Sequence, residues 1–303
     1  MKTTFCTIST ESHIGKTKAL FESLRKNRFE GDLFCLIIDC EEIPNSSYGE
    51  IYLTVDELIA KNKKLIQEKY KSDKLRWALK AVLLEHLILK GFDKAIYTDN
   101  DVYFYENPDF LLDDLDKNNI LLSPHFYNSD SRIKQNWLEA NFTVGLFNAG
   151  FIGVNSNALD FLKWWQDCCI YNIKKAFWRG LFDDQKYLDL VPIKFEKVLI
   201  LKHKGCNVAG WNLEECKRTI SENEIVIINQ KYPIVFIHFT PLTVEKIRNG
   251  EDYLLQTNLD EYQKALLENG FSNHQLECKK MTKSNIYNYC KYLWWIISRQ
   301  FEK

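Results

Sequence analysis

Apolar residues recur along the chain in two patterns, short continuous runs and helically spaced positions. Continuous runs are typical of strands buried on both faces of a sheet. The sequence predicts such strands at residues 5–8, 33–38, 95–98, 120–123, 150–154, 198–201, 225–228 and 234–237. Helical spacing predicts helices that contain residues 19–24, 72–91 and 159–169, with Ser72 as the N-cap and Gly91 at the end of the second. Strands that alternate with helices indicate an α/β domain with a mostly parallel central sheet.

The last segment of the chain has a different pattern. Between residues 279 and 303, lysine and arginine alternate with aromatic residues, which crowd together at Trp294-Trp295. This pattern is typical of a basic amphipathic helix at a membrane interface, and the alternative is a helix docked on the domain through its aromatic side chains. We therefore expect one domain over residues 1–245 and a helical extension over residues 246–303 that contacts a membrane peripherally.

Composition narrows the classes of function. The net charge is −1, so no overall positive field would attract nucleic acid. The nine cysteines are odd in number and contain no C-x-x-C pair, which argues against a zinc site or a disulfide framework and is typical of a reducing compartment. No apolar run reaches the roughly 18 residues of a membrane span, and no signal segment opens the chain. We expect a cytoplasmic protein, at most peripheral on the cytoplasmic face of a membrane.

The clearest candidate for chemistry is Asp99-Asn100-Asp101, which follows the predicted strand at residues 95–98. Open α/β sheets bind ligands beyond the carboxyl ends of their strands. In extended geometry the two carboxylates point the same way, and they repel each other unless a cation joins them. A hard divalent ion with oxygen ligands is the natural partner. The alternative is a solvated turn, because Asp and Asn favour turns.

Further motifs follow in a fixed order along the chain. They are Asn148-Ala149-Gly150, Asp183-Asp184-Gln185, the segment 206–212 with the sequence CNVAGWN, and His238-Phe239 after a strand. With the D-x-D motif, this ordered set resembles GT-A glycosyltransferases, in particular the family-eight retaining enzymes and their bacterial relatives. The resemblance covers roughly residues 3–245. It implies a Rossmann-like domain that binds a nucleotide-diphospho-sugar.

The resemblance also implies roles for the matching residues. Asp99, Asp101 and His238 would hold Mn2+ or Mg2+. Asn148, Asp184 and Gln185 would act on the transferred sugar. The nucleotide and its diphosphate would be bound by Ser9, Thr10, Asp39, Arg76, Lys80, Asp99 and Asn100. The implied reaction moves a hexose from a nucleotide sugar, UDP-linked, onto a glycan or glycolipid acceptor, with retention favoured over inversion.

Each of these motifs also has a purely structural interpretation. Residues 148–150 would be a turn, Asp183-Asp184 a helix start, His238 a buried core histidine, and the loop at residues 9–13 an ordinary connection. Of Arg76 and Lys80, which share a helix face, one is expected to be solvated. The chain also lacks the Gly and Trp that usually follow the late His in the family, and Lys246 is not in clear register. If the reaction inverts, Asp183 or Asp184 is the candidate base.

Two rival functions remain. Gly15-Lys16-Thr17 lies between a strand and a helix, as in a P-loop ATPase or kinase, but Thr10 occupies the position of the first glycine. The second rival is a non-catalytic protein of the same fold that binds glycans or nucleotides. Two retained carboxylates, Asp99 and Asp101, argue against it, because a site without catalysis needs no metal pair.

Overall fold

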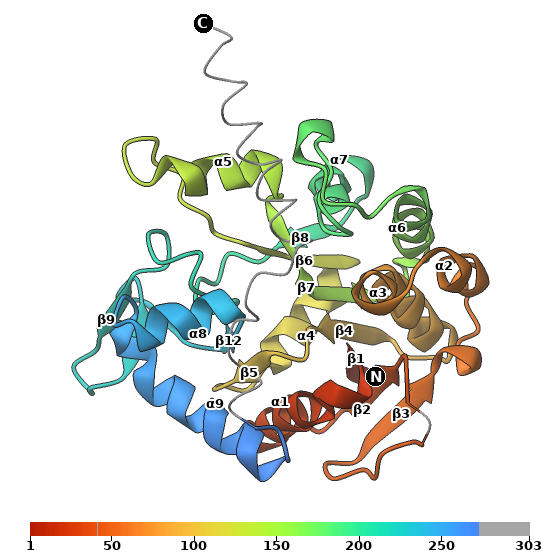
Figure 1. The fold of residues 1–303 in the computed structure, drawn as a ribbon, viewed down its shortest axis with the longest axis horizontal. Coiled ribbons are helices and arrows are strands. Elements are labelled where there is room, and N and C mark those ends of the chain that lie inside the picture. The colour runs from red at the N-terminus through yellow and green to blue at the C-terminus, as the bar shows by residue number, and fades with distance from the viewer. Residues whose placement is uncertain (41, 273–303) are drawn as a thin grey trace, which may run out of the picture.

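The computed structural model describes residues 1–40 and 42–272 (Figure 1). The basic aromatic segment at residues 279–303 lies outside this range, so the amphipathic tail and its membrane contact stay predictions. Within the described part of the chain, no helix has the length and apolarity that crossing a bilayer requires.

A seven-stranded sheet forms the centre of the fold, in the order β3-β2-β1-β4-β7-β6-β8. Its strands are β1 (Thr3–Ser9), β2 (Asp32–Ile37), β3 (Glu50–Thr54), β4 (Lys94–Thr98), β6 (Ile120–Pro124), β7 (Phe147–Asn155) and β8 (Val198–Ile200). Neighbouring strands are parallel except where β7 runs antiparallel to β4 and β6. The predicted mostly parallel α/β sheet is confirmed. Edge strand β3 was not predicted, and its Ile51 is exposed.

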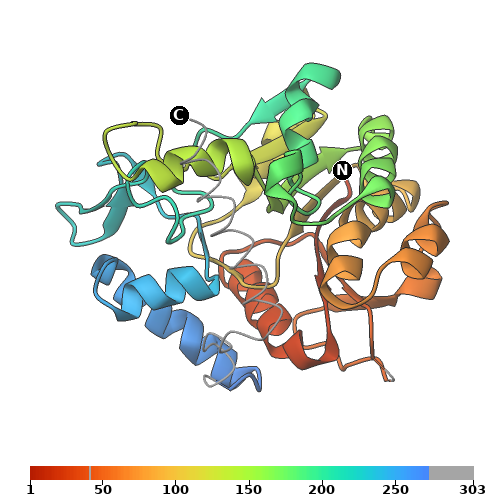
Figure 2. The ribbon, with the colours of Figure 1, turned by 45° about the horizontal axis from the view of Figure 1, so that its top comes forward.

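Helices cover both faces of this sheet, which explains the continuous apolar runs. On β1, Cys6 and Ile8 pack with α3 (Ser72–Leu89) and α6 (Leu159–Tyr171), whereas Phe5 points to the other face. That other face is covered by α1 (Ile14–Lys26) and α4 (Asp109–Lys117) (Figures 1 and 2). Because both faces are buried, successive side chains of a central strand are all apolar.

The other helices are shorter or lie at the edges of the domain. They are α2 (Lys63–Lys69), α5 (Gln135–Thr143), α7 (Val191–Lys194), α8 (Pro241–Arg248) and α9 (Gln256–Glu268), with 3-10 turns η1 (Glu11–His13), η2 (Val55–Glu57), η3 (Phe177–Arg179), η4 (Lys186–Leu190) and η5 (Tyr253–Leu255). The predicted cap of α3 is wrong. Ser72 is itself the first helical residue, and no side-chain hydrogen bond caps the helix from Lys71.

The two last predicted strands exist but do not join the central sheet. β10 (Val226–Ile228) lies in a small sheet with β9 (Arg218–Ile220) and β11 (Tyr232–Pro233), and β12 (Phe236–His238) pairs antiparallel with β5 (Val102–Phe104). Apolar runs report burial but not the partner strand, which explains the error. The β5–β12 pair follows directly after the D-x-D motif.

The C-terminal helices α8 and α9 pack against the β5–β12 pair. Tyr262 of α9 stacks on Phe239, with ring centroids 4.3 Å apart, and also contacts Tyr103 of β5. The expected boundary between residues 245 and 246 falls inside α8. The division into a catalytic domain and an extension stays a prediction.

Candidate metal and donor site

The D-x-D motif lies at the carboxyl end of β4, in the middle of the sheet. The backbone N–H of Asp99 donates to the carbonyl oxygen of Gly150 on the neighbouring strand β7 over 2.8 Å, which fixes where the motif begins. The Tyr97 hydroxyl donates to Oδ1 of Asp99 over 2.7 Å. The Asp99 side chain is 31% exposed, so it is open to a ligand. Residues 99–102 form a turn, closed by the Val102 N–H donating to the Asp99 carbonyl oxygen over 3.3 Å, so the expected extended geometry is wrong. The contacts of Asp99 hold this turn in place at the carboxyl end of β4.

His238 reaches the same point from the other end of the chain. Its Nε2 lies 3.0 Å from Oδ1 of Asp101 and 4.0 Å from Oδ2 of Asp99. One ligand atom from each of the three residues lies within 4.8 Å of the other two. His238 is buried as a core histidine would be, but its ring lines a cavity and faces both carboxylates. The predicted trio is therefore brought together.

The charged groups of this trio shift one another's pKa values. Burial opposes ionisation of Asp101, but the charge and hydrogen bond of His238 outweigh it and hold the pKa of that carboxyl well below its usual range. In the same way, burial lowers the pKa of His238, and the neighbouring Asp101 and Asp99 more than compensate and raise it. Two carboxylates and an imidazole are donors that suit Mn2+, whereas carboxylates alone suit Mg2+.

A glycine makes room for the trio. A Cβ atom at Gly150 would lie 2.7 Å from Oδ2 of Asp99, 2.8 Å from Oδ1 of Asn148 and 2.8 Å from Cε1 of His238. The side-chain amide of Asn148 lies 3.3 Å from Nδ1 of His238, which leaves Nε2 on the side of Asp101. Such outer contacts orient metal-binding histidines. These observations fit a divalent ion, and they place Asn148-Ala149-Gly150 within β7, not in a turn.

Lys80 connects the metal candidates to the Asp183-Asp184 motif. Its Nζ lies 3.4 Å from Oδ1 of Asp99 and 3.3 Å from Oδ2 of Asp184, and it donates to the Ala149 carbonyl oxygen over 3.1 Å. Lys80 is 3% exposed. Burial lowers its pKa, but Asp184 and Asp99 outweigh this and raise it.

Arg76, one helical turn earlier, is more exposed than Lys80. Its side chain is 23% exposed and pairs with the exposed Asp73 at 2.7 Å. Of the two residues, Arg76 is therefore the one in contact with solvent. Arg76 itself lines the cavity that contains the trio.

The D-x-D motif lines the first of two adjoining cavities. The first, of about 430 Å3, holds Asp99, Asn100, Asp101, Asn148, Gln185 and His238 at its surface. The second, of about 730 Å3, is lined by Thr10, Asp39 and residues of β3, α2 and α3. Arg76 lines the first cavity and its ion-pair partner Asp73 lines the second, so the two adjoin there.

The loop at residues 9–13 has a more specific structure than an ordinary connection. Its Glu11 N–H donates to Oδ1 of Asp39 over 2.8 Å, which closes one end of the second cavity. Ser9 is fully buried and is not among the described residues that line either cavity. It instead accepts a hydrogen bond from the Asn100 amide at 3.2 Å and so supports the D-x-D motif from behind.

The Asp183-Asp184-Gln185 motif does not begin a capped helix. η4 starts one residue later, at Lys186, and no side-chain hydrogen bond caps it. Asp184 is buried against Lys80, whereas Asp183 and Gln185 line the first cavity. Of the predicted sugar-binding residues, Asn148 and Gln185 line the cavity. Asp184 is connected to it through Lys80, which contacts both Asp184 and Asp99.

Sequence reasoning missed part of the cavity wall. The missed residues are Trp77, Tyr97, His125, Tyr127, Val144, Lys175, Phe182 and Trp211. Burial lowers the pKa of His125 to about 3, so this ring is neutral. The only sequence signal for Trp211 was its place in the segment 206–212, which belongs to the ordered set of motifs. No motif surrounds Lys175 in the sequence, and it reaches the cavity only through the way the chain folds.

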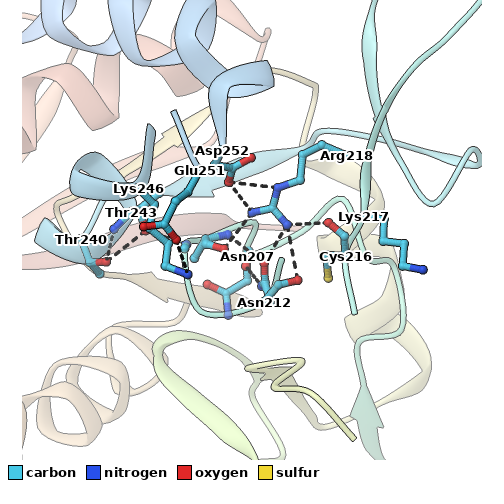
Figure 3. A network of polar contacts seen from close by, with 12 residues as sticks. Asn207, Asn212, Cys216, Lys217, Arg218, Thr240, Thr243, Lys246, Glu251 and Asp252 are labelled. Atoms are coloured by element: carbon cyan, nitrogen blue, oxygen red, sulfur yellow. Dashed lines mark hydrogen bonds and ion pairs between the residues drawn. The ribbon is translucent and has the colours of Figure 1, made fainter. Parts of the chain in front are cut away.

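A buried polar network holds the segment that carries Trp211 (Figure 3). Arg218 forms two hydrogen bonds or ion pairs with Oδ2 of Asp252, at 3.1 and 3.0 Å, and donates to the Ala209 carbonyl oxygen over 2.8 Å. The Gly210 N–H donates to the Thr243 hydroxyl over 3.0 Å. The backbone N–H of His238 in turn donates to the carbonyl oxygen of Val208 in this segment, over 2.9 Å. The network therefore positions both Trp211 and His238.

The segment Gly15-Lys16-Thr17 does not form a phosphate-binding loop. The 3-10 turn η1 occupies residues 11–13, and the glycine lies in the first turn of α1. A Cβ atom at Gly15 would lie 2.6 Å from Cβ of Phe271, so packing against the chain after α9 explains this glycine.

Comparisons with known proteins give weak but consistent likenesses. No model of a known protein family matches the chain. Two Bacillus subtilis (strain 168) proteins described as uncharacterized are similar to it. YfnF is 24% identical over 255 residues, which are 82% of this chain and 84% of that protein. YfnD is 25% identical over 256 residues, which are 79% of this chain and 78% of that protein.

Solved structures with some likeness to this chain include three glycosyltransferases. Mouse xyloside xylosyltransferase 1 in its apo form has a TM-score of 0.49 and 14% identity, over 78% of this chain and 97% of that one. The galactosyltransferase LgtC, in complex with donor and acceptor sugar analogs, has a TM-score of 0.48 and 15% identity, over 78% of this chain and 86% of that one. A glycosyltransferase involved in glycosylation of the major capsid of PBCV-1 has a TM-score of 0.48 and 14% identity, over 83% of this chain and 100% of that one. These values assign no reaction to the chain, so we infer the reaction from the side chains of the site.

Proposed function

We propose that this protein is a metal-dependent hexosyltransferase that uses a nucleotide sugar, UDP-linked, as donor and a glycan or glycolipid as acceptor. The observation that carries the proposal is the convergence of Asp99, Asp101 and His238, each with a ligand atom within 4.8 Å of the others, at the surface of the first cavity. Asp99 and Asp101 are partly exposed, at 31% and 19%, so their oxygens remain accessible to a hard divalent ion of the kind that carboxylates bind.

The donor fits across the two cavities. The larger cavity, with Thr10 and Asp39 at its surface, would take the nucleoside. The diphosphate would then pass the junction at Arg76 and reach the trio, and the hexose would enter the first cavity. A volume of about 430 Å3 lies within the range of about 300–1,000 Å3 that small-ligand sites occupy.

The chain's own residues prepare this site for transfer. Asp99 and Asp101 would hold Mn2+ or Mg2+ together with His238, and the bound ion supplies Lewis-acid chemistry that offsets charge on the leaving diphosphate. Lys80 neutralises part of the charge of Asp99 and Asp184. Asn148 and Gln185 offer amide groups of fixed direction to sugar hydroxyls. Retention is the proposed course, with the departing phosphate taking the acceptor's proton.

The test is hydrolysis of nucleotide sugars by the purified full chain, with Mn2+ and with excess EDTA. We expect nucleoside diphosphate release that requires Mn2+, that is greatest with a UDP-hexose, and that Asp101→Asn abolishes. Asp113→Asn on the exposed side of α4 is the matched control and should retain full activity. Full activity in EDTA contradicts the metal-dependent reaction. Tight donor binding by wild type without any turnover would instead identify a non-catalytic binding protein.

A further inference from the structure

One wall of the first cavity is not used by the donor chemistry proposed above. It consists of Trp77 of α3, Lys175 in the segment before η3, and Phe182 with Asp183 after it. The Lys175 ammonium lies 5.3 Å from the ring centroid of Trp77 and 4.8 Å from that of Phe182. It also lies 3.3 Å from Oδ2 of Asp183. Two aromatic rings, a cation and a carboxylate thus meet at one place on the cavity wall.

Asp183 is a buried carboxylate with an oxygen that lacks a donor. Its side chain is only 9% exposed, and Oδ1 has no hydrogen-bond partner in the described part of the chain. A buried acceptor without a donor is destabilising, and such groups call for an explanation by function. The backbone of Asp183, with a φ of 48°, is in the left-handed region, which Asp and Asn adopt more often than other residues with side chains.

We propose that Asp183 positions a sugar acceptor by binding the hydroxyl next to the attacking one, and that the acceptor ring packs against Trp77 and Phe182. The inference rests on the proposed transferase function and names the acceptor side of the same cavity. Sugar rings present apolar C–H faces and hydroxyl edges, which match flat aromatic surfaces flanked by a carboxylate and an ammonium. Lys175 is 51% exposed, so it can shift away from the rings when a sugar enters.

The transfer step balances with Asp183 in this role. The acceptor oxygen forms a bond to the anomeric carbon, and the bond from that carbon to the diphosphate oxygen breaks. The electron pair of the broken bond leaves with the nucleoside diphosphate. In the retaining course the hydroxyl proton passes to the departing phosphate oxygen. Asp183 accepts a hydrogen bond from the hydroxyl next to the attacking one on the acceptor ring. This contact orients the attacking oxygen and requires the carboxylate to be ionised.

The surroundings of Asp183 predict when it is ionised. Burial is the largest influence, and with Asp184 it raises the pKa of Asp183 to about 6, against the opposing charges of Lys175 and Lys80. Acceptor binding should therefore weaken as the pH falls below about 6. Removing the Lys175 charge should raise the pKa of Asp183 further and move this limit to higher pH.

The test compares nucleoside diphosphate release with and without acceptor, using free hexoses and p-nitrophenyl hexosides as probes. We expect a member of this panel to raise release by wild type above the rate of hydrolysis. Asp183→Asn should lower kcat/KM for that acceptor at least tenfold more than it lowers the rate of Mn2+-dependent hydrolysis without acceptor. The exposed Asp160→Asn in α6 is the matched control. An unfolding midpoint close to that of wild type excludes misfolding.

Lys175→Met provides a second measurement that a purely structural role would not affect. It should shift the acidic limb of acceptor kcat/KM to higher pH, whereas the neighbouring Lys174→Met should not. Unchanged acceptor kinetics in Asp183→Asn, an unshifted limb in Lys175→Met, or no stimulation by any probe would each overturn the inference and leave donor hydrolysis intact. Absence of metal-dependent hydrolysis by wild type would overturn the proposed function itself, and the inference with it.

Discussion

Nε2 of His238 lies 3.0 Å from Oδ1 of Asp101, although 137 positions separate the two residues in the chain. The contact is a consequence of strand pairing. β12 runs antiparallel to β5, with His238 opposite Val102, and the Phe239 N–H donates to the Asp101 carbonyl oxygen over 2.7 Å. A two-strand ribbon beyond the main sheet therefore delivers the imidazole to the D-x-D motif.

Metal binding should stabilise the folded protein through this trio. An ion held by three residues this far apart in the sequence would bind only the folded state, so we expect the thermal unfolding midpoint to rise with Mn2+ concentration and to fall back with EDTA. His238→Ala should raise, at least tenfold, the Mn2+ concentration that is needed for a given rise of the unfolding midpoint. The control is His203→Ala, a histidine outside the trio, and an undiminished Mn2+ shift in His238→Ala would exclude His238 as a ligand.

Gly150→Ala should damage the site through space alone. The added methyl group meets Asp99, Asn148 and His238 at 2.7–2.8 Å, so the trio must spread. We expect Mn2+ affinity to fall about 10- to 100-fold, the effect typical of disturbed outer contacts of a metal site.

Gly153→Ala on the opposite face of β7 is the matched control for Gly150→Ala. Its added methyl group would meet only apolar atoms, the nearest being Leu115 Cδ1 and Leu121 Cβ at 3.1 Å. It should cost about 1–3 kcal/mol of stability through overpacking and leave Mn2+ affinity unchanged. Isothermal titration with Mn2+ separates the two variants, and equal affinities would contradict the steric argument.

Lys80→Met should lower both stability and donor turnover. Asp184 would keep a buried carboxylate without its cation, and removing one partner of a buried pair typically costs about 3–5 kcal/mol. We expect donor hydrolysis to fall at least tenfold. Lys74→Met, on the exposed side of the same helix, should change neither quantity. Donor hydrolysis equal to that of wild type would show that Lys80 does not act on the site.

Arg218→Met should destabilise the segment at residues 206–212, which carries Trp211, more than it weakens metal binding. The side chains of Arg218 and Asp252 are 4% and 3% exposed, so loss of the arginine leaves the Asp252 carboxyl buried without its partner. We expect a loss of about 3–5 kcal/mol, measured by urea denaturation. The double variant Arg218→Met, Asp252→Leu removes both charges and should recover part of it. No recovery would show that the contacts of Arg218 with Ala209 and Asn212, rather than the ion pair, dominate.

The sequence by itself predicted six of the seven strands of the central sheet and the trio of Asp99, Asp101 and His238 that the fold brings together. Phe5, Cys6 and Ile8 form a continuous apolar run because both faces of β1 are covered, and such a run is visible without a structure. Asp99 and Asp101 were found because two carboxylates directly after a buried strand repel each other unless a cation joins them. His238 was found from the order of motifs, although neither its partner strand nor its distance from Asp101 could be inferred.

Only the tertiary structure decided how distant segments meet around the cavity. Lys80 was assigned to nucleotide binding or solvent, but helix α3 packs so that its ammonium lies between Asp99 and Asp184. Lys175 and Asp183 follow no periodic pattern, and their loop reaches the cavity through backbone that includes a left-handed residue. Local patterns record burial and secondary structure. Side-chain contacts between remote segments depend on packing geometry, which no short stretch of sequence encodes.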